Sequence, residues 1–145
     1  MKSSGQSSRR VVTVAVIALA VWGLIATRKN PSATIASGEF HQVAHKGVGS
    51  AAIVCLANGE RALRLAGFRT YPASELEVRL IAAPDAFDNE TVEKSAPISL
   101  GPLETTDGDQ SYTLPYNLDL TIYRAVTIWS RKYGVNFTTA PLVLH

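Results

Sequence analysis

The longest hydrophobic stretch of the chain runs from Val11 to Ala26 and is interrupted only by Thr13 and Gly23. At about 1.5 Å per residue, a helix of this length measures roughly 24 Å, which is the short end of what crosses a bilayer. Because the stretch is apolar on every side, it is not typical of a helix in a soluble core. The pattern predicts one membrane-spanning helix over residues 11–27, preceded by a polar tail over residues 1–10.

A cleaved signal peptide is the alternative, because basic residues precede the hydrophobic stretch as they do in secretory signals. The one good small-x-small triplet, Ala18-Leu19-Ala20, lies inside the stretch, and the following Arg28 and Lys29 disfavour cleavage. An uncleaved signal-anchor is therefore favoured. The positive-inside tendency then predicts a cytoplasmic N-terminus, with the rest of the chain facing the periplasm or the cell exterior.

Beyond the hydrophobic stretch, residues 28–38 are small and polar and are expected to form a linker. Short half-apolar runs separated by turn residues follow. In the clearest run, Leu76, Val78 and Leu80 alternate with charged residues, as in a strand with one buried face. Asn58-Gly59 indicates a tight hairpin, and the polar residues 85–95 are expected to form an exposed loop.

About seven such runs at regular spacing predict an all-β domain over residues 39–145, an antiparallel β-sandwich without a long helix. A domain of this length forms a core without the help of disulfides. The side chains expected to be mainly buried are Phe40, Val54, Phe68, Val78, Leu80, Leu100, Tyr112, Val126, Ile128, Trp129 and Phe137. Trp129 is expected to fill the sandwich core, and an aromatic ligand surface with Tyr133 is the alternative.

The positive net charge belongs to the N-terminal part of the chain. Residues 1–29 carry five basic residues and no acidic one, whereas residues 30–145 carry nine basic and twelve acidic residues. The domain is thus mildly acidic, with a net charge of −3 against +2 for the whole chain. Nucleic-acid binding depends on clustered positive charge, so no nucleic-acid partner is expected.

A series of sequence blocks resembles the electron-transfer DM-thirteen domain. These blocks are Gly38-Glu39-Phe40, LEVRL at 76–80, SLGPL at 99–103, GDQSYTLP at 108–115, Ile128-Trp129 and FTTAPL at 137–142. The resemblance covers about Gly38 to Leu142, and the GDQSYTLP block and the Ile-Trp pair are its most specific parts. It implies a β-sandwich module of secreted and membrane proteins, often found beside haem-binding sandwich domains, with a proposed redox or electron-transfer role.

The redox role proposed for the family is centred on a cysteine directly after the tryptophan, where this chain has Ser130. A serine hydroxyl neither forms a thiolate at physiological pH nor a disulfide. Ser130 also lacks the G-x-S-x-G surroundings of a hydrolase nucleophile. This departure removes the key atom of the redox chemistry proposed for the family, and no catalytic residue is predicted.

Cys55 and His45 are the candidates for binding a cofactor. Cys55 is the only cysteine, so no intramolecular disulfide forms, and its apolar neighbours predict packing as a small hydrophobe, with a reactive thiol as the alternative. Cys55 takes the place of the thiol missing at Ser130 only if the strands that carry these two residues are neighbours. His45 recurs in the family and is expected to make a structural hydrogen bond, with haem or metal ligation as the alternative.

No metal site is predicted. His41 and His45 are four residues apart, but they precede a strand, so a shared helical face is not implied. Asp107, Asp109 and Asp119 are acidic residues of the kind that hold calcium in extracellular sandwiches, but turn formation explains the Asp-Gly pair on its own.

Together these features favour a membrane-tethered, extracytoplasmic domain that acts as a non-catalytic binding module for a protein or envelope partner. A non-enzymatic role is favoured over an enzymatic one. The alternative function is electron transfer through a bound haem or Cys55.

Overall fold

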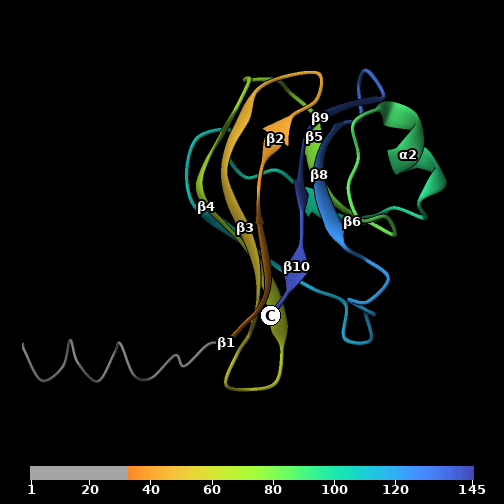
Figure 1. The fold of residues 1–145 in the computed structure, drawn as a ribbon. Coiled ribbons are helices and arrows are strands. Elements are labelled where there is room, and N and C mark those ends of the chain that lie inside the picture. The colour runs from red at the N-terminus through yellow and green to blue at the C-terminus, as the bar shows by residue number, and fades with distance from the viewer. Residues whose placement is uncertain (1–32) are drawn as a thin grey trace, which may run out of the picture. The chain divides into compact units, whose positions relative to one another are not determined.

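The computed structural model describes residues 33–145, which form two five-stranded antiparallel sheets packed as a sandwich (Figure 1). The predicted tail, the predicted anchor at 11–27 and residues 28–32 of the predicted linker lie outside this range. Between residues 33 and 145, no helix is long and apolar enough to cross a membrane. The prediction of an all-β, antiparallel sandwich is confirmed for the described part of the chain.

The two sheets draw their strands from both halves of the domain. The first sheet has the order β10-β1-β3-β4-β7, with β1 at Ala33–Glu39, β3 at Gly47–Cys55, β4 at Arg61–Thr70, β7 at Gln110–Thr113 and β10 at Val143–Leu144. The second has the order β2-β9-β8-β5-β6, with β2 at His41–Gln42, β5 at Leu76–Ile81, β6 at Ile98–Pro102, β8 at Ala125–Ser130 and β9 at Val135–Pro141. One short helix, α2 at Asn89–Lys94, also lies within the described residues.

Strand β1 replaces most of the expected linker. It pairs with β3 from Ala33, opposite Cys55, to Glu39, opposite Ser50. At Gly38 the small residue is required by packing rather than by flexibility. A Cβ atom on Gly38 would lie 1.6 Å from the carbonyl oxygen of Pro141, so no side chain fits at that position. The prediction of a linker over residues 33–38 was therefore wrong, because small residues suit a close approach of strands as well as they suit a linker.

The hydrophobic core lies between the sheets and follows the predicted alternation. Every residue of the predicted core is buried except Leu100, which is partly buried and packs against the core. Trp129, however, lies in a second, smaller cluster with Ile81, Ala86, Val92 and Ala125. The prediction that Trp129 fills the sandwich core was wrong, because its neighbour Ile128 faces the core and successive residues of a strand point to opposite faces.

Helix α2 and the segment before it belong to this second cluster. The Asp88 carboxylate accepts a hydrogen bond from the Thr91 amide at 2.7 Å and caps the helix, and Val92 is fully buried. The prediction of an exposed loop over residues 85–95 was therefore wrong in part. The segment is mainly polar, but its buried apolar residues Ala86 and Val92 anchor it, including the short helix, against the second sheet.

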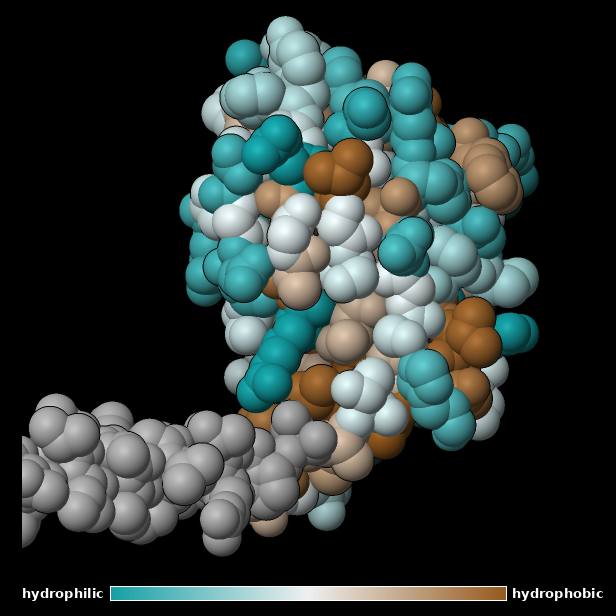
Figure 2. All heavy atoms as spheres, turned by 60° about the vertical axis from the view of Figure 1, so that its left-hand side comes forward, coloured by the Kyte–Doolittle hydropathy of each residue, from teal (hydrophilic) through white to brown (hydrophobic). Residues whose placement is uncertain are grey.

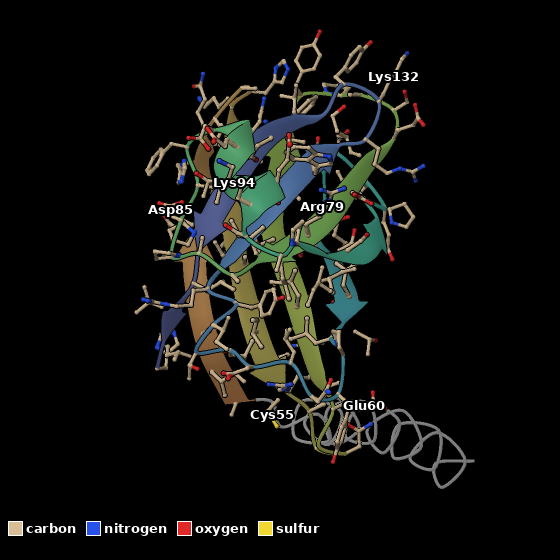
Figure 3. All side chains as sticks on the ribbon, turned by 90° about the vertical axis from the view of Figure 1, so that its right-hand side faces the viewer. Cys55, Glu60, Arg79, Asp85, Lys94 and Lys132 are labelled. Carbon is tan, nitrogen blue, oxygen red and sulfur yellow. The ribbon has the colours of Figure 1, made fainter. Side chains whose placement is uncertain are left out.

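Strand β5 is buried on both faces, although its sequence predicts only one. Arg79 Nε lies 2.5 Å from Glu77 Oε1, and Ser99 Oγ donates to Glu77 Oε2 at 3.0 Å. The guanidinium carbon of Arg79 lies 4.8 Å from the centroid of the Trp129 ring. Figure 3, which faces the side of the second sheet, shows Arg79 near the centre of that side rather than at its edge. The charged residues of β5 are thus paired with each other and covered.

The block GDQSYTLP has a structural role. The Gln110 side-chain oxygen accepts from the Glu104 and Thr105 amides at 3.1 and 3.2 Å and from the Tyr112 hydroxyl at 2.6 Å. Its amide nitrogen donates to the Thr105 and Gly108 carbonyls. Burial raises the pKa of Tyr112 above its ordinary value of 10.0, since the phenolate would lose hydration. The phenol therefore stays a hydrogen-bond donor, and the block fixes the loop before β7.

Candidate functional site: the aromatic end of the sandwich

One end of the sandwich carries a group of aromatic side chains, here named the aromatic end: His45, Tyr71, Tyr133 and Phe137. His45 comes from the β2–β3 connection, Tyr71 follows β4, and Tyr133 lies in the turn between β8 and β9. Figure 3 shows Lys132, the neighbour of Tyr133, at this end and Cys55 and Glu60 at the other. Three parts of the chain that are far apart in the sequence thus meet here, since Tyr133 and Phe137 are only four residues apart.

His45 is the centre of the aromatic end. Its ring stacks on Tyr71, with centroids 4.6 Å apart and an angle of 20° between the planes. It also packs against Phe137, with centroids 4.2 Å apart at 51°. Among residues 33–145 the imidazole has ring contacts but no side-chain hydrogen bond, whereas the His45 amide donates to the Phe137 carbonyl at 3.0 Å. The expected structural hydrogen bond is therefore replaced by aromatic packing.

Two hollows adjoin the stacked rings of His45 and Tyr71. The first, of about 280 Å³, is lined by both rings together with Lys46, Val48 and Arg69. The second, of about 300 Å³, is lined by both rings and continues along the β4–β5 connection to Tyr133 and Phe137. Each volume lies at the lower end of the range for small-molecule sites. The two hollows share a wall, so a single elongated molecule can lie across both.

The tyrosines of the aromatic end are unusually exposed for residues with large apolar rings. Tyr71 is 59% exposed and Tyr133 is 66% exposed. The amino group of Lys132 lies 5.3 Å from the centroid of the Tyr133 ring, within range of a cation–π contact. Exposed aromatic rings beside a hollow are characteristic of a binding surface rather than of a core. The sequence pointed to Tyr133 as part of such a surface, but it gave no indication of Tyr71, whose partners lie far away along the chain.

Positive charge collects at this end of a domain whose net charge is negative. Lys46 and Lys132 are exposed and form no ion pair with any residue between 33 and 145. Arg69 faces Asp107 at 3.5 Å, and both side chains are about two-thirds exposed, so the pair contributes little and opens readily. Figure 2 shows mainly hydrophilic residues over the upper part of the first sheet, whereas hydrophobic residues gather toward its lower end.

Ser130 lies at the base of the β8–β9 turn next to the aromatic end. It is fully buried, its hydroxyl accepts from the Tyr133 amide at 3.2 Å, and its carbonyl accepts from the Gly134 amide at 2.9 Å. The turn closes with Gly134 at a φ of +62°, a conformation that favours glycine. Ser130 is thus a turn-forming residue, and in this fold the family's cysteine position lies beneath the turn that carries Tyr133.

Cys55 lies far from Ser130. It ends β3 in the first sheet, opposite Ala33 and Arg61, whereas Ser130 ends β8 in the second sheet. The two strands are not neighbours, so Cys55 does not take the place of a thiol at Ser130. Cys55 is partly exposed, and its Sγ lies 3.8 Å from the Leu56 carbonyl oxygen.

The other candidate ligands do not converge on a metal ion. His41 Nε2 lies 2.6 Å from Asp85 Oδ1, and its ring stacks on Phe87, so His41 and His45 have different partners. Asp109 accepts from the Gly67 amide, and Asp119 caps a turn through Thr121. No group of three metal-binding side chains occurs within residues 33–145.

A haem needs an axial ligand and a slot that encloses the macrocycle. His45 is the one histidine at the aromatic end, and its ring is already packed against the rings of Tyr71 and Phe137. The adjacent hollows, of about 280 and 300 Å³, are open to solvent and are too small to enclose a haem macrocycle. The described residues therefore do not fit an enclosed haem.

Comparisons with known proteins bear on the whole domain. A family model described as "Electron transfer DM13" matches residues 39–142. Among curated proteins, no match is found. Among solved structures, the chain is similar to a mutant of superoxide dismutase 5 from Candida albicans, with a TM-score of 0.53 and 10% sequence identity over 77% of this chain and 92% of that chain. At this identity the likeness shows the sandwich fold alone.

Proposed function

The chain belongs to the Electron transfer DM13 family, and on that premise we propose that it is a non-catalytic binding module that contacts its partner through the aromatic end. The partner is a protein or another component of the cell envelope. The hydrophobic stretch over residues 11–27 holds the domain at a membrane, on the periplasmic or outer side.

The observation that carries this proposal is the exposure of aromatic rings around two hollows. Tyr71 and Tyr133 keep most of their surface in water, although burial of such rings is favourable. Aromatic residues are enriched at the centres of binding interfaces, where they supply a large contact area with few rotatable bonds. A sandwich that positions four aromatic side chains from three separate parts of the chain is suited to recognition.

Electron transfer is the second candidate, and the family's description favours it. In this chain the position of the family's cysteine is Ser130, a buried turn residue, and the one cysteine lies in the other sheet at the opposite end. A redox role would therefore have to use Cys55 or a group bound at the surface. These departures support the binding module over the redox domain.

Site-specific photocrosslinking tests the binding role directly. A photoreactive amino acid is placed at Tyr71 and, as a matched control, at Tyr116, which is 95% exposed and lies beside the hollow near Glu60. In cells that carry the full chain, adducts are expected from position 71 and not from position 116. Adducts from both positions equally, or from neither, would overturn the proposal.

The redox candidate is tested with the purified full chain in mild detergent. We expect a protein without a Soret band and without a reversible midpoint potential. A Soret band that survives dialysis, or a potential that disappears in Cys55→Ser, would replace the binding module with the redox function. The Cys55→Ser variant is expected to keep its stability within about 1 kcal/mol, because a partly exposed thiol adds little packing.

A further inference from the structure

We propose that the ligand of the aromatic end is an acidic oligosaccharide, whose sugar rings lie on Tyr71 and Tyr133 and whose acid groups meet Lys46 and Lys132. This inference rests on the proposed binding function and names the chemistry of the partner. It follows from three observations: the shape of the hollows, the lack of an open strand edge beside them, and the local charge.

The shape of the site favours an elongated ligand with flat units. The two hollows are both walled by the His45–Tyr71 stack, and only these two residues line both of them. One ring face of Tyr71 is covered by His45, so its remaining exposed surface faces away from that stack. The C–H face of a sugar ring packs on an aromatic face, burying apolar area while its hydroxyl groups remain in water.

The backbone around the hollows argues against a peptide. An extended peptide gains most of its affinity by adding a strand to an open sheet edge. Beside the second hollow, the amides of Val43, Ala44 and His45 already donate to carbonyls of β9. Beside the first, Val48 and Arg69 lie opposite each other in β3 and β4, and Arg69 also forms a β-bridge with Asp107 on its other side. The site therefore offers side chains rather than backbone groups.

The charge of the site selects an acidic ligand over a neutral one. Lys46 lines the first hollow, and Lys132 lies over Tyr133 at the margin of the second. Neither forms an ion pair within the described residues, and Arg69 is held only by an exposed contact with Asp107. The acidic residue closest in sequence to the lining of the second hollow is Glu75, which follows Ser74. Carboxylates along a sugar chain would neutralise the lysines without desolvating them fully.

Isothermal titration of the full chain in mild detergent tests the inference with three probes. They are an oligogalacturonate, a neutral malto-oligosaccharide of the same length and an oligoglutamate of the same charge. The uronate is expected to bind with a Kd below about 1 mM and to weaken as salt shortens the Debye length from about 10 Å at 0.1 M to about 3 Å at 1 M. The other two probes are expected to bind at least about tenfold more weakly.

Two site variants and two matched controls locate the binding. Tyr71→Ala and Lys46→Glu are each expected to weaken uronate binding about three- to tenfold, in the range of one aromatic or ionic contact. Tyr116→Ala and Lys94→Ala remove an exposed tyrosine and an exposed lysine elsewhere and are expected to leave binding unchanged. Tyr71→Phe, which keeps the ring, is expected to bind like the unaltered chain.

Each remaining outcome overturns the inference. Equal binding of oligoglutamate would show that charge alone is recognised, and equal binding of the neutral sugar would remove the role of the lysines. Equal loss in the controls, or no binding of the uronate at all, would refute the site. If the uronate fails but photocrosslinks from position 71 are found, the binding function stands and only the ligand class is wrong. A reversible redox signal would instead refute the binding function.

Discussion

Replacement of Arg79 by methionine tests whether the charged pair inside strand β5 stabilises the fold. The side chains of Arg79 and Glu77 are only 21% and 10% exposed, and their nearest atoms are 2.5 Å apart. Methionine keeps most of the packing volume beside Trp129 but removes the charge. The Glu77 carboxylate would then keep one side-chain hydrogen bond, from Ser99 at 3.0 Å.

The expected magnitude follows from the burial of the pair. Breaking a fully buried ion pair by removing one partner costs about 3–5 kcal/mol, because a charge is left without its counterion. Since Arg79 retains some contact with water, we expect about 2–4 kcal/mol for Arg79→Met, including roughly 0.5–2 kcal/mol for the cation–π contact with Trp129. The double variant Glu77→Gln, Arg79→Met removes both charges and is expected to lie within about 1–2 kcal/mol of the unaltered chain.

Urea unfolding of the full chain in detergent, followed by circular dichroism, measures these free energies. The single variants Glu77→Gln and Arg79→Met form a double-mutant cycle with the double variant. The coupling energy between the two residues is expected to exceed about 1 kcal/mol. Lys94→Met is the matched control, because Lys94 pairs with Glu90 on the exposed side of α2 and its loss is expected to cost less than about 0.5 kcal/mol. A cost below about 1 kcal/mol for Arg79→Met, or additive costs in the cycle, would refute the reasoning.

Three further predictions concern the core, the helix and the N-terminus. Leu80→Ala removes a fully buried side chain and is expected to lower the free energy of unfolding by about 2–5 kcal/mol; a loss under about 1 kcal/mol would contradict the core assignment. Hydrogen bonds from Thr91 lower the pKa of Asp88 below its ordinary value of 3.8, so the cap stabilises α2 above that pH and is lost as the pH falls through the lower folded value. Amide protection at Thr91 should therefore decline below about pH 4 in the unaltered chain but not in Asp88→Asn. N-terminal sequencing of the membrane-extracted protein should give a chain that starts before Ala20, and a start at or beyond Ala20 would exclude the anchor.

The inner face of the sandwich was predictable because alternation along a strand is a local signal. Val78 and Leu80 are fully buried as their spacing indicates, and Asn58-Gly59 forms the β3–β4 hairpin with Gly59 at a φ of +86°. The outer face was not predictable in the same way. Arg79 reads as a solvent-facing residue until Glu77 and Trp129 are known to lie beside it.

The candidate site was predictable only in fragments. Tyr133 and His45 were candidates for separate roles. Tyr133 and Phe137 are only four residues apart, but nothing local links either of them to His45 or Tyr71. Side chains that meet across loops are brought together by strand order, and short sequences carry little information on strand order. The same reasoning applies to Cys55 and Ser130, whose distance from each other depends on the sheets to which β3 and β8 belong.

Strand β1 enters the sandwich at Ala33, beside the Cys55 end of β3, whereas the other end of β3 leads to Lys46 at the aromatic end. A ligand held at that end, with the chain fixed before Ala33, would pull the antiparallel β1–β3 pair from opposite ends. The load would then run along the strands, and all the hydrogen bonds between β1 and β3 from Ala33 to Glu39 would share it at once. These hydrogen bonds would not open one after another. This loading geometry would let the domain resist mechanical tension between its attachment point and its partner.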